Sequence, residues 1–482
     1  MLEQLQPKEV FHFFEEICAI PHGSGNVDKI SDYLVAFAKE RGLSVMQDSL
    51  KNVIITKQAT AGYEEKAPVI IQGHMDMVAV KEEGCTKDMM TDGLDLRVDG
   101  DYVYAQGTSL GGDDGIAVAY ALALLDSTDI AHPPLEVVIT VDEEVGMDGA
   151  TGIDLSGLKG SMLLNIDSET EGELTVACAG GVTVSAQWDV EWTQAEGTLY
   201  ELSLSGLTGG HSGTEIDKHR ANANKVLLHL LYVLEREIDL NLVSVRGGTK
   251  DNVIPRMASA QFYSRADAAQ VQSIVSVMEQ ALREEWQQTD PGLILQCREL
   301  QDDGEPKDSL EKNDFFRLLS FFEKAPDGVQ AMSSDLPGLV ETSLNMGTVC
   351  LTNGGGMKAG FLLRSSKEDA KKALCAKLHK LVSESQGAYS RSSDYPSWEF
   401  RKDSPLREKM VQIYRDQFGK EPVVLSIHAG LECGILAQKI RNLDAVSFGP
   451  DILDIHTTDE KLSISSTQRT WEYLKTILKE LS

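Results

Sequence analysis

Short apolar runs alternate with helical stretches over the first 180 residues, and this alternation constrains the fold more than any other feature. Four runs are short, apolar and followed by polar turns, which predicts strands at residues 53–56, 69–72, 135–141 and 162–166. Between the second and third runs, residues 115–126 (GIAVAYALALLD) are apolar on nearly all sides and predict a buried helix. Strands that alternate with helices form a largely parallel sheet covered on both faces. We therefore expect a three-layer α/β domain.

The pattern changes after Gly180 and Gly181. Residues 182–190 and 198–204 alternate apolar and polar side chains, as strands of a sheet with one wet face do. Helical stretches follow, at residues 222–237, 267–287 and 366–383. The last of these leads into a polar segment, SESQGAYSRSSDYPSW, which we interpret as a loose connection at a domain boundary.

The α/β pattern returns near residue 394, with strands predicted at residues 422–426 and 445–448 and a final helix after Ser466. The simplest organisation is an α/β catalytic domain built from both chain ends, residues 1–182 and 394–482. An α+β lid domain, residues 183–393, is then inserted within it.

Composition excludes several functional classes. The 482 residues contain 45 Lys and Arg against 75 Asp and Glu, for a net charge of −30, which disfavours binding to nucleic acid or anionic lipid. The longest apolar stretch, residues 116–125, is shorter than the ~18 residues that a membrane span needs. The N-terminus is predicted to be an amphipathic helix rather than a signal peptide. Seven dispersed cysteines without a CxxC pair favour a reducing compartment, so we expect a cytoplasmic protein.

Acidic and histidine clusters follow the predicted strands. They are His74-Met75-Asp76, Asp142-Glu143-Glu144, Asp167 and Asp454-Ile455-His456, and Asp113-Asp114 opens the buried helix. Ligands of open α/β sheets bind beyond the carboxyl ends of the strands, so these clusters are expected to converge.

Each cluster taken alone has an ordinary explanation. His74 could be a core histidine, Glu143-Glu144 a solvated turn, Asp113-Asp114 a helix cap and His456 a loop residue. Their recurrence at equivalent topological places favours a shared site instead.

The chemistry of these side chains suits a pair of divalent cations. The four positive charges of two cations would be balanced by Asp113, Glu144, Asp167 and one bridging hydroxide, with His74 and His456 as neutral nitrogen ligands. Imidazole and carboxylate ligands without thiolate suit Zn, with Co or Mn as alternatives. Two metals ~3.5–4 Å apart are a known solution for peptide and ester hydrolysis.

Eight motifs, in order along the chain, carry a resemblance to a known family. They are GHMDMV (73–78), TSLGGDDGIA (108–117), TVDEEVGMDGA (140–150), NIDSE (165–169), GGHSG (209–213), DNVIPR (251–256), HAGLECG (428–434) and DIHTTDE (454–460). Together they resemble the M20 family of metallopeptidases, and within it the bacterial cytosolic Xaa-His (aminoacyl-histidine) dipeptidases. Each motif is weak by itself, but the ordered set is specific.

The resemblance implies a role for each site residue. His74 and His456 would each bind one metal, Asp113 would bridge both, and Glu144 and Asp167 would each complete one site. Glu143 would be the general base, and Asp76 would hold the His74 imidazole. Residues i and i+2 of an extended segment point the same way, and metal-bound histidines usually donate their second N–H to a carboxylate.

The inserted domain would supply the residues that contact the substrate. By resemblance, His211 would polarise the scissile carbonyl, Asn252 and Arg364 would hold a C-terminal carboxylate, and Gly430 would contact the substrate through its backbone. Without the resemblance, His211 and Gly430 would be interpreted as turn residues and Arg364 as a surface residue. His428 and Cys433 are interpreted as structural.

One departure from the family pattern lies beside the bridging aspartate. This chain has Gly112 and Asp114 where the family member that it resembles has Ala and Asn. Asp114 adds a negative charge near the metals but leaves the ligand set intact. The resemblance also implies a cis peptide bond between Asp113 and Asp114.

These observations predict a dinuclear metallo-dipeptidase that acts on Xaa-His and other dipeptides. The alternatives are another amide hydrolase of the same superfamily (a tripeptidase, carboxypeptidase or deacylase) or a non-catalytic binding protein on the same fold. The expected partners are small peptides, without nucleic acid or membrane, and the resemblance implies a homodimer.

Overall fold

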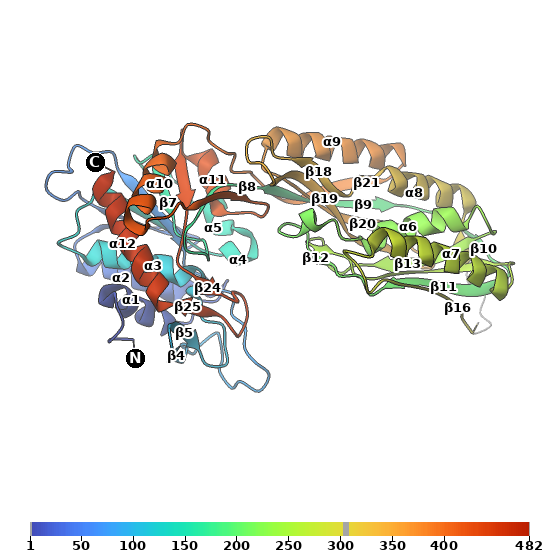
Figure 1. Cartoon of the computed structure of the whole chain (residues 1–482), viewed down its shortest axis with the longest axis horizontal. Coiled ribbons are helices and arrows are strands. Elements are labelled where there is room, and N and C mark those ends of the chain that lie inside the picture. The colour runs from blue at the N-terminus through green and yellow to red at the C-terminus, as the bar shows by residue number, and fades with distance from the viewer. Residues whose placement is uncertain (1, 302–307, 482) are drawn as a thin grey trace. The chain divides into compact units, whose positions relative to one another are not determined.

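The computed structural model describes residues 2–301 and 308–481, and the chain forms two compact units (Figure 1). Unit 1 comprises Met1–Cys178, Phe400–Ser426 and Leu431–Ser482. Unit 2 comprises Ala179–Glu399 and Ile427–Gly430.

An eight-stranded sheet forms the centre of unit 1, in the order β1-β2-β6-β3-β7-β23-β8-β22. Its strands are β1 (Ser44–Gln47), β2 (Val53–Lys57), β3 (Val69–His74), β6 (Leu135–Thr140), β7 (Met162–Asn165), β8 (Glu173–Cys178), β22 (Val423–Ile427) and β23 (Asp444–Ser447). The four central strands, β6, β3, β7 and β23, run parallel, and antiparallel pairings flank them. Every residue of β3 and β6 is buried, as expected for a parallel sheet covered on both faces. The predicted α/β class is confirmed.

The helices of unit 1 cover its eight-stranded sheet, and one of them, α3, is itself buried. They are α1 (Lys8–Cys18), α2 (Asp28–Glu40), α3 (Gly112–Asp126), α4 (Glu143–Gly146), α5 (Asp148–Gly152), α10 (Pro405–Phe418), α11 (Glu432–Lys439) and α12 (Ile464–Glu480). The α3 helix is buried from Gly112 to Leu125, which explains why its sequence is apolar on nearly all sides. It packs against α1, and its Tyr120 ring stacks on Trp471 of α12 at 5.7 Å.

A small sheet in unit 1 carries the last of the sequence motifs. Its order is β24-β25-β5-β4, with β4 (Leu96–Asp99), β5 (Tyr102–Ala105), β24 (Ile452–Leu453) and β25 (Lys461–Ser463). The loop between β24 and β25 contains His456 and Glu460. This sheet therefore anchors both ends of the loop that bears His456.

Unit 2 is an antiparallel sheet with helices on one face. The strand order is β16-β11-β15-β13-β19-β20-β9-β21, with β18 pairing off β19. The strands are β9 (Gly180–Trp188), β11 (Thr198–Ser205), β13 (Asn241–Gly247), β15 (Ala258–Ser264), β16 (Ile294–Glu299), β18 (Gly328–Met332), β19 (Val340–Leu351), β20 (Met357–Ser365) and β21 (Ala388–Tyr395). Two short pairs, β10 (Trp192–Gln194) with β17 (Asp308–Leu310) and β12 (Gly210–His211) with β14 (Val253–Ile254), complete its strands within the described residues.

Alternation along β9 explains the one-sided packing in unit 2. Val182, Val184, Ala186 and Trp188 are buried in one core with residues from all four long helices. Those helices are α6 (Ala223–Leu234), α7 (Ala268–Trp286), α8 (Lys312–Lys324) and α9 (Glu368–Glu384). The intervening residues of β9 face the other side of the sheet, as the predicted wet face requires.

The segment at residues 383–398 corrects one expectation. It was predicted to be a loose connection, but Ala388–Tyr395 forms β21, which pairs antiparallel with β9 at the edge of the sheet. Its side chains are mostly exposed, so it needs no alternation of apolar residues.

No helix among the described residues has the length and apolar character to cross a bilayer.

Candidate functional site

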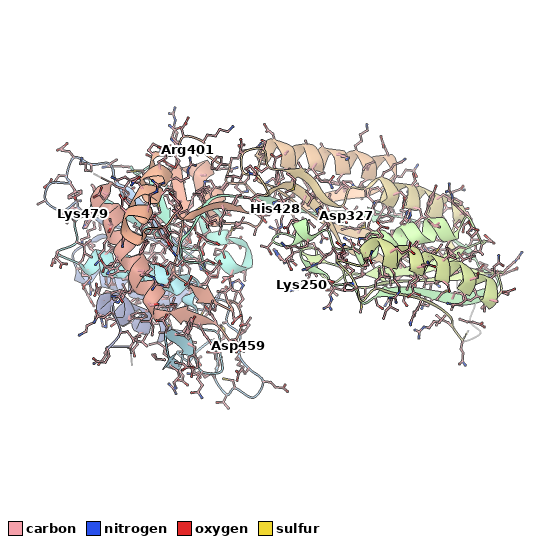
Figure 2. The ribbon with its side chains drawn as sticks, in the orientation of Figure 1. Lys250, Asp327, Arg401, His428, Asp459 and Lys479 are labelled. Carbon is pink, nitrogen blue, oxygen red and sulfur yellow. The ribbon has the colours of Figure 1, made fainter. Side chains whose placement is uncertain are left out.

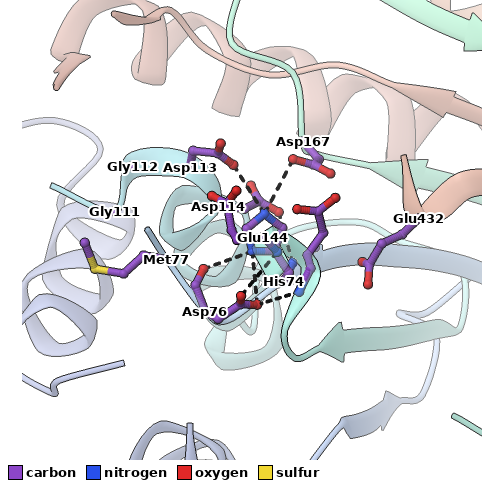
Figure 3. Close-up of polar contacts among 12 residues, drawn as sticks. His74, Asp76, Met77, Gly111, Gly112, Asp113, Asp114, Glu144, Asp167 and Glu432 are labelled. Atoms are coloured by element: carbon purple, nitrogen blue, oxygen red, sulfur yellow. Dashed lines mark hydrogen bonds and ion pairs between the residues drawn. The ribbon is translucent and has the colours of Figure 1, made fainter. Parts of the chain in front are cut away.

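The residues predicted to bind metal meet at one edge of the unit 1 sheet. His74 ends β3, Glu144 lies on α4 directly after β6, and Asp167 follows β7. Because β6, β3 and β7 are adjacent and parallel, their carboxyl ends lie side by side. Asp113, in the first turn of α3, reaches the same place (Figure 3).

Asp113 lies between the two imidazoles. Its Oδ1 is 3.3 Å from Nε2 of His74, and its Oδ2 is 3.2 Å from Nε2 of His456. Asp167 adds an oxygen 3.7 Å from Nε2 of His74, and Glu144 adds one 2.9 Å from Nε2 of His456. The five side chains thus form two groups of three that share Asp113, with one of its oxygens directed to each group.

These side chains fit divalent cations. Among the residues that the structure describes, two sets have ligand atoms within 4.8 Å of one another: His74 with Asp113 and Glu144, and His74 with Asp114 and Asp167. In the described part of the chain, the buried Oδ2 of Asp167 has no hydrogen-bond donor. A buried carboxylate oxygen without a donor is costly unless a cation satisfies it. Imidazole and carboxylate donors without thiolate are a suitable set for zinc and similar metals.

The histidines and carboxylates of this cluster shift one another's pKa values. Burial alone would raise the pKa of Asp113, but its contacts with His456 and His74 hold that pKa well below its usual value. Contacts with Asp113 and Glu144 raise the pKa of His456 to about 10. Although burial opposes it, the pKa of His74 is also raised well above its usual value, by Asp113, Asp167 and Asp76. A cation that binds here would compete with protons for these two rings.

Asp76 contacts both His74 and the start of α4. Nδ1 of His74 lies 2.9 Å from the backbone oxygen of Asp76 and 3.5 Å from its carboxylate (Figure 3). The carboxylate also accepts hydrogen bonds from the backbone N–H groups of Glu143 (3.1 Å) and Glu144 (3.4 Å) and from the Ser24 hydroxyl (2.8 Å). Asp76 therefore orients the imidazole mainly through its backbone, while its side chain fixes the two glutamates.

Glu143 and Glu144 are successive residues of α4 in different surroundings. Burial raises the pKa of Glu143 well above its usual value, His74 opposes this, and the carboxylates of Asp167, Glu432 and Glu144 add to it. Glu144 instead contacts His456 directly. The two carboxylates therefore have different surroundings: Glu144 contacts the His456 imidazole, whereas Glu143 is affected mainly by burial.

The junction of Asp113 and Asp114 has the backbone that the resemblance implies. The peptide bond between them is cis, and both residues depart from helical φ and ψ. Asp114 accepts a hydrogen bond from the backbone N–H of His74 at 3.1 Å. A Cβ at Gly73 would lie 2.5 Å from the Asp114 carboxylate, so glycine is needed at this point of β3.

In unit 2, His211 presents one ring nitrogen as a donor. It lies on β12, which pairs with β14 next to Asn252. Its Nδ1 accepts hydrogen bonds from the backbone N–H groups of Gly213 (3.3 Å) and Thr214 (3.2 Å), so its proton is carried on Nε2. Burial and the charge of Arg364 lower the pKa of His211, which keeps the ring neutral near pH 7.

Arg364 and Asn252 line one cavity of about 560 Å³ in unit 2, together with Lys250 and Tyr395. Arg364 is 7% exposed and donates from Nη1 to the Tyr395 hydroxyl at 2.7 Å. Within the described residues, Nε of Arg364 and Oδ1 of Asn252 are buried without a hydrogen-bond partner. The cavity thus holds a guanidinium with an unused donor.

Gly430 belongs to the short segment Ile427–Gly430, which is part of unit 2. This segment lies next to Gly213, two residues after His211. A Cβ at Gly213 would lie 2.6 Å from the backbone oxygen of His428. The His428 ring is hydrogen-bonded through Nε2 to the Ser343 hydroxyl at 2.7 Å, and burial with the charge of Arg364 lowers its pKa to about 3. His428 and Lys250 both belong to unit 2 (Figure 2).

A buried polar network, which the sequence did not reveal, lies beside the candidate metal ligands. Glu432, at the start of α11, accepts hydrogen bonds from the side chains of Gln72 and Thr140, each at 2.6 Å. Asn165 donates to Gln72 at 2.6 Å, which links β3, β6 and β7 below the site. Burial raises the pKa of Glu432 to about 8. The available signal was its place within HAGLECG, one of the eight motifs.

Comparison with known proteins identifies the family of this chain. Residues 70–480 match the model of peptidase family M20/M25/M40. The cytosol non-specific dipeptidase of Escherichia coli (strain K12) is 38% identical over 483 residues, which cover 100% of this chain and 99% of that protein. The crystal structure of aminoacylhistidine dipeptidase from Vibrio alginolyticus superposes with a TM-score of 0.93 at 35% identity, covering 99% of this chain and 98% of that one.

A more distant structure shares the fold alone. The aminopeptidase PepT of Bacillus cereus covers 99% of both chains with a TM-score of 0.57, at 16% identity. The family match, the two closely similar dipeptidases and the clustered motif residues confirm the resemblance found in the sequence. The chain belongs to peptidase family M20/M25/M40.

Proposed function

We propose that this protein is a dinuclear metal-dependent dipeptidase that cleaves Xaa-His dipeptides and a broader range of other dipeptides. The observation that carries the proposal is Asp113, whose two oxygens lie 3.3 and 3.2 Å from the imidazoles of His74 and His456. The names of the relatives from E. coli and V. alginolyticus support dipeptides as the substrates. In this proposal, residues 1–182 and 394–482 are the catalytic domain, and residues 183–393 are the lid.

The proposed metal ligands follow from the two groups around Asp113. His74 and Asp167 would hold one cation, His456 and Glu144 the other, and Asp113 both. Zinc is the proposed metal, and cobalt and manganese are the alternatives that the same donors accept. When bound, the cations supply Lewis acidity that polarises the scissile carbonyl and activates a water molecule.

Glu143 is proposed to be the general base. It would take a proton from the attacking water and deliver that proton to the leaving amine. Burial raises the pKa of Glu143, whereas bound cations would lower it. The two effects together favour an intermediate pKa, as a general base needs. Asp76 holds the backbone of Glu143 in place by accepting its N–H at 3.1 Å.

The residues of unit 2 are proposed to bind the substrate. His211 would donate from Nε2 to the carbonyl oxygen as it becomes negatively charged. Arg364 and Asn252 would bind the C-terminal carboxylate, because a guanidinium fork matches a carboxylate in geometry and charge. The backbone at Gly430 would contact the substrate directly. These roles favour a dipeptide over a longer peptide.

A panel of substrates tests the proposal against its alternatives. Xaa-His and other dipeptides should be hydrolysed faster than tripeptides, C-terminally extended peptides and N-acyl amino acids of matched side chains. Fastest cleavage of tripeptides would support a tripeptidase, and fastest cleavage of acyl amino acids a deacylase. Binding of these compounds without hydrolysis of any would support the non-catalytic alternative.

Two further proposals concern the state of the protein in the cell. We propose a cytoplasmic location, which the name of the E. coli relative supports. We also propose a homodimer, on the basis of the family resemblance, which light scattering of the purified protein would test.

A further inference from the structure

Glu460 is a buried carboxylate that accepts hydrogen bonds from four consecutive backbone N–H groups. Its Oε2 accepts from Leu110 (2.8 Å) and Gly111 (3.0 Å), and its Oε1 accepts from Gly112 (2.8 Å) and Asp113 (3.4 Å). The side chain is 2% exposed. Charge-assisted bonds of this kind are stronger than neutral ones, so the carboxylate holds this turn firmly.

The backbone before α3 is shaped to receive the carboxylate. Gly111 has φ of 67°, in the left-handed region, and its Cβ would lie 2.7 Å from the sulfur of Met77. Successive N–H groups around such a residue turn toward one side and form a concave site for an anion. A Cβ at Gly112 would lie 3.3 Å from Oε1 of Glu460, so the carboxylate and this turn are in close contact.

Glu460 joins the two segments that carry Asp113 and His456. Asp113 is the last of the four N–H donors, and His456 precedes Glu460 by four residues in the loop between β24 and β25. The carboxylate of Asp113 in turn lies 3.2 Å from His456. The Glu460 side chain therefore ties the loop that carries His456 to the backbone that carries Asp113.

We propose that Glu460 is a positioning residue of the metal centre, which sets the placement of Asp113 relative to His456 without itself binding a cation or the substrate. This inference rests on the proposed metal site. Partners beyond the direct ligands typically change metal affinity by about 10- to 100-fold when they are lost. A similar change is expected here, because Asp113 would bridge both cations.

Glu136 provides a matched control within unit 1. It is 7% exposed and accepts hydrogen bonds from the backbone N–H groups of Lys159 (2.9 Å) and Gly160 (2.9 Å). It lies at the start of β6, at the opposite end of the strand from the metal-binding residues. Glu136→Gln therefore makes the same chemical change at a buried carboxylate without touching the proposed site.

Three variants separate positioning from charge and from general stability. Glu460→Gln removes the charge and directs an amide N–H₂ toward backbone donors, whereas Glu460→Asp keeps the charge but shortens its reach. Calorimetric titration of metal-free protein with Zn²⁺ should show about 10- to 100-fold weaker binding in both variants and parental binding in Glu136→Gln. The visible absorption spectrum of the Co²⁺-loaded Glu460 variants should also differ from that of the parent, because it reports ligand geometry. Circular dichroism first establishes that each variant is folded at the temperature of titration.

Several results would overturn the inference. Parental affinity and an unchanged Co²⁺ spectrum in Glu460→Asp, with loss only in Glu460→Gln, would assign the effect to charge. Glu460 variants that fail to fold while Glu136→Gln folds would assign the residue a general structural role. A parent protein that binds no divalent cation would overturn the proposed function as well, whereas parental binding in both Glu460 variants would overturn this inference alone.

Discussion

Replacement of Glu143 by Gln is expected to lower kcat for a dipeptide by about 10²–10⁴-fold, because Gln keeps the shape of the side chain but cannot accept a proton. Metal content should stay at the parental value, since Glu143 belongs to neither of the candidate metal-ligand groups found among the described residues. KM should change little, because the loss falls on the chemical step. Steady-state kinetics with metal analysis of the same sample measure both quantities.

Glu144→Gln is the matched control, since it makes the same change one residue along α4. Glu144 contacts His456 at 2.9 Å and belongs to a set of candidate metal ligands. This variant should bind one cation more weakly, and excess metal should restore part of its activity. Loss of a metal in Glu143→Gln, with two retained in Glu144→Gln, would reverse the assigned roles.

Amidation of the C-terminal carboxylate of a dipeptide substrate should lower kcat/KM strongly. Arg364 is 7% exposed and has a buried Nε without a hydrogen-bond partner in the described chain. Loss of the charged partner of a buried guanidinium costs ~2–5 kcal/mol. At about 1.4 kcal/mol per tenfold, this corresponds to roughly 30- to 4,000-fold in kcat/KM. The measurement compares a dipeptide and its amide as substrates.

Two variants assign this discrimination to a residue. Arg364→Met should remove most of the difference between acid and amide. Lys250→Met should keep it, because Lys250 lines the same cavity and has the same charge but is exposed. Equal cleavage of the acid and the amide by the parent protein would contradict the proposed role of Arg364 and favour an aminopeptidase.

The buried elements of the fold could be predicted from the sequence. β3 and β6 are buried throughout, so their residues form continuous apolar runs, and α3 is apolar on all sides for the same reason. β21 was missed because an edge strand with exposed Ser, Arg and Asp side chains has the composition of a loop. The small sheet of β24, β25, β5 and β4 was also missed, because strands of two to four residues are too short to show a period.

The candidate site could be predicted where its side chains follow strands. His74, Glu144 and Asp167 lie at the carboxyl ends of adjacent strands, so topology alone brings them together. The backbone contact of Asp76 with His74 could not be predicted, because a motif shows side chains and not carbonyl directions. Glu432 and Glu460 act through partners that are hundreds of residues away in sequence, and only the folded chain shows them.

Metal analysis combined with a dipeptide assay tests the central claim most directly. The purified protein should contain two divalent cations per chain and hydrolyse Xaa-His dipeptides. Removal of both cations by a chelator should abolish hydrolysis, and returning two equivalents of Zn²⁺, Co²⁺ or Mn²⁺ should restore it. Dipeptide hydrolysis that continues at the full rate in metal-free protein, or a fully loaded protein that hydrolyses no dipeptide, would contradict the account.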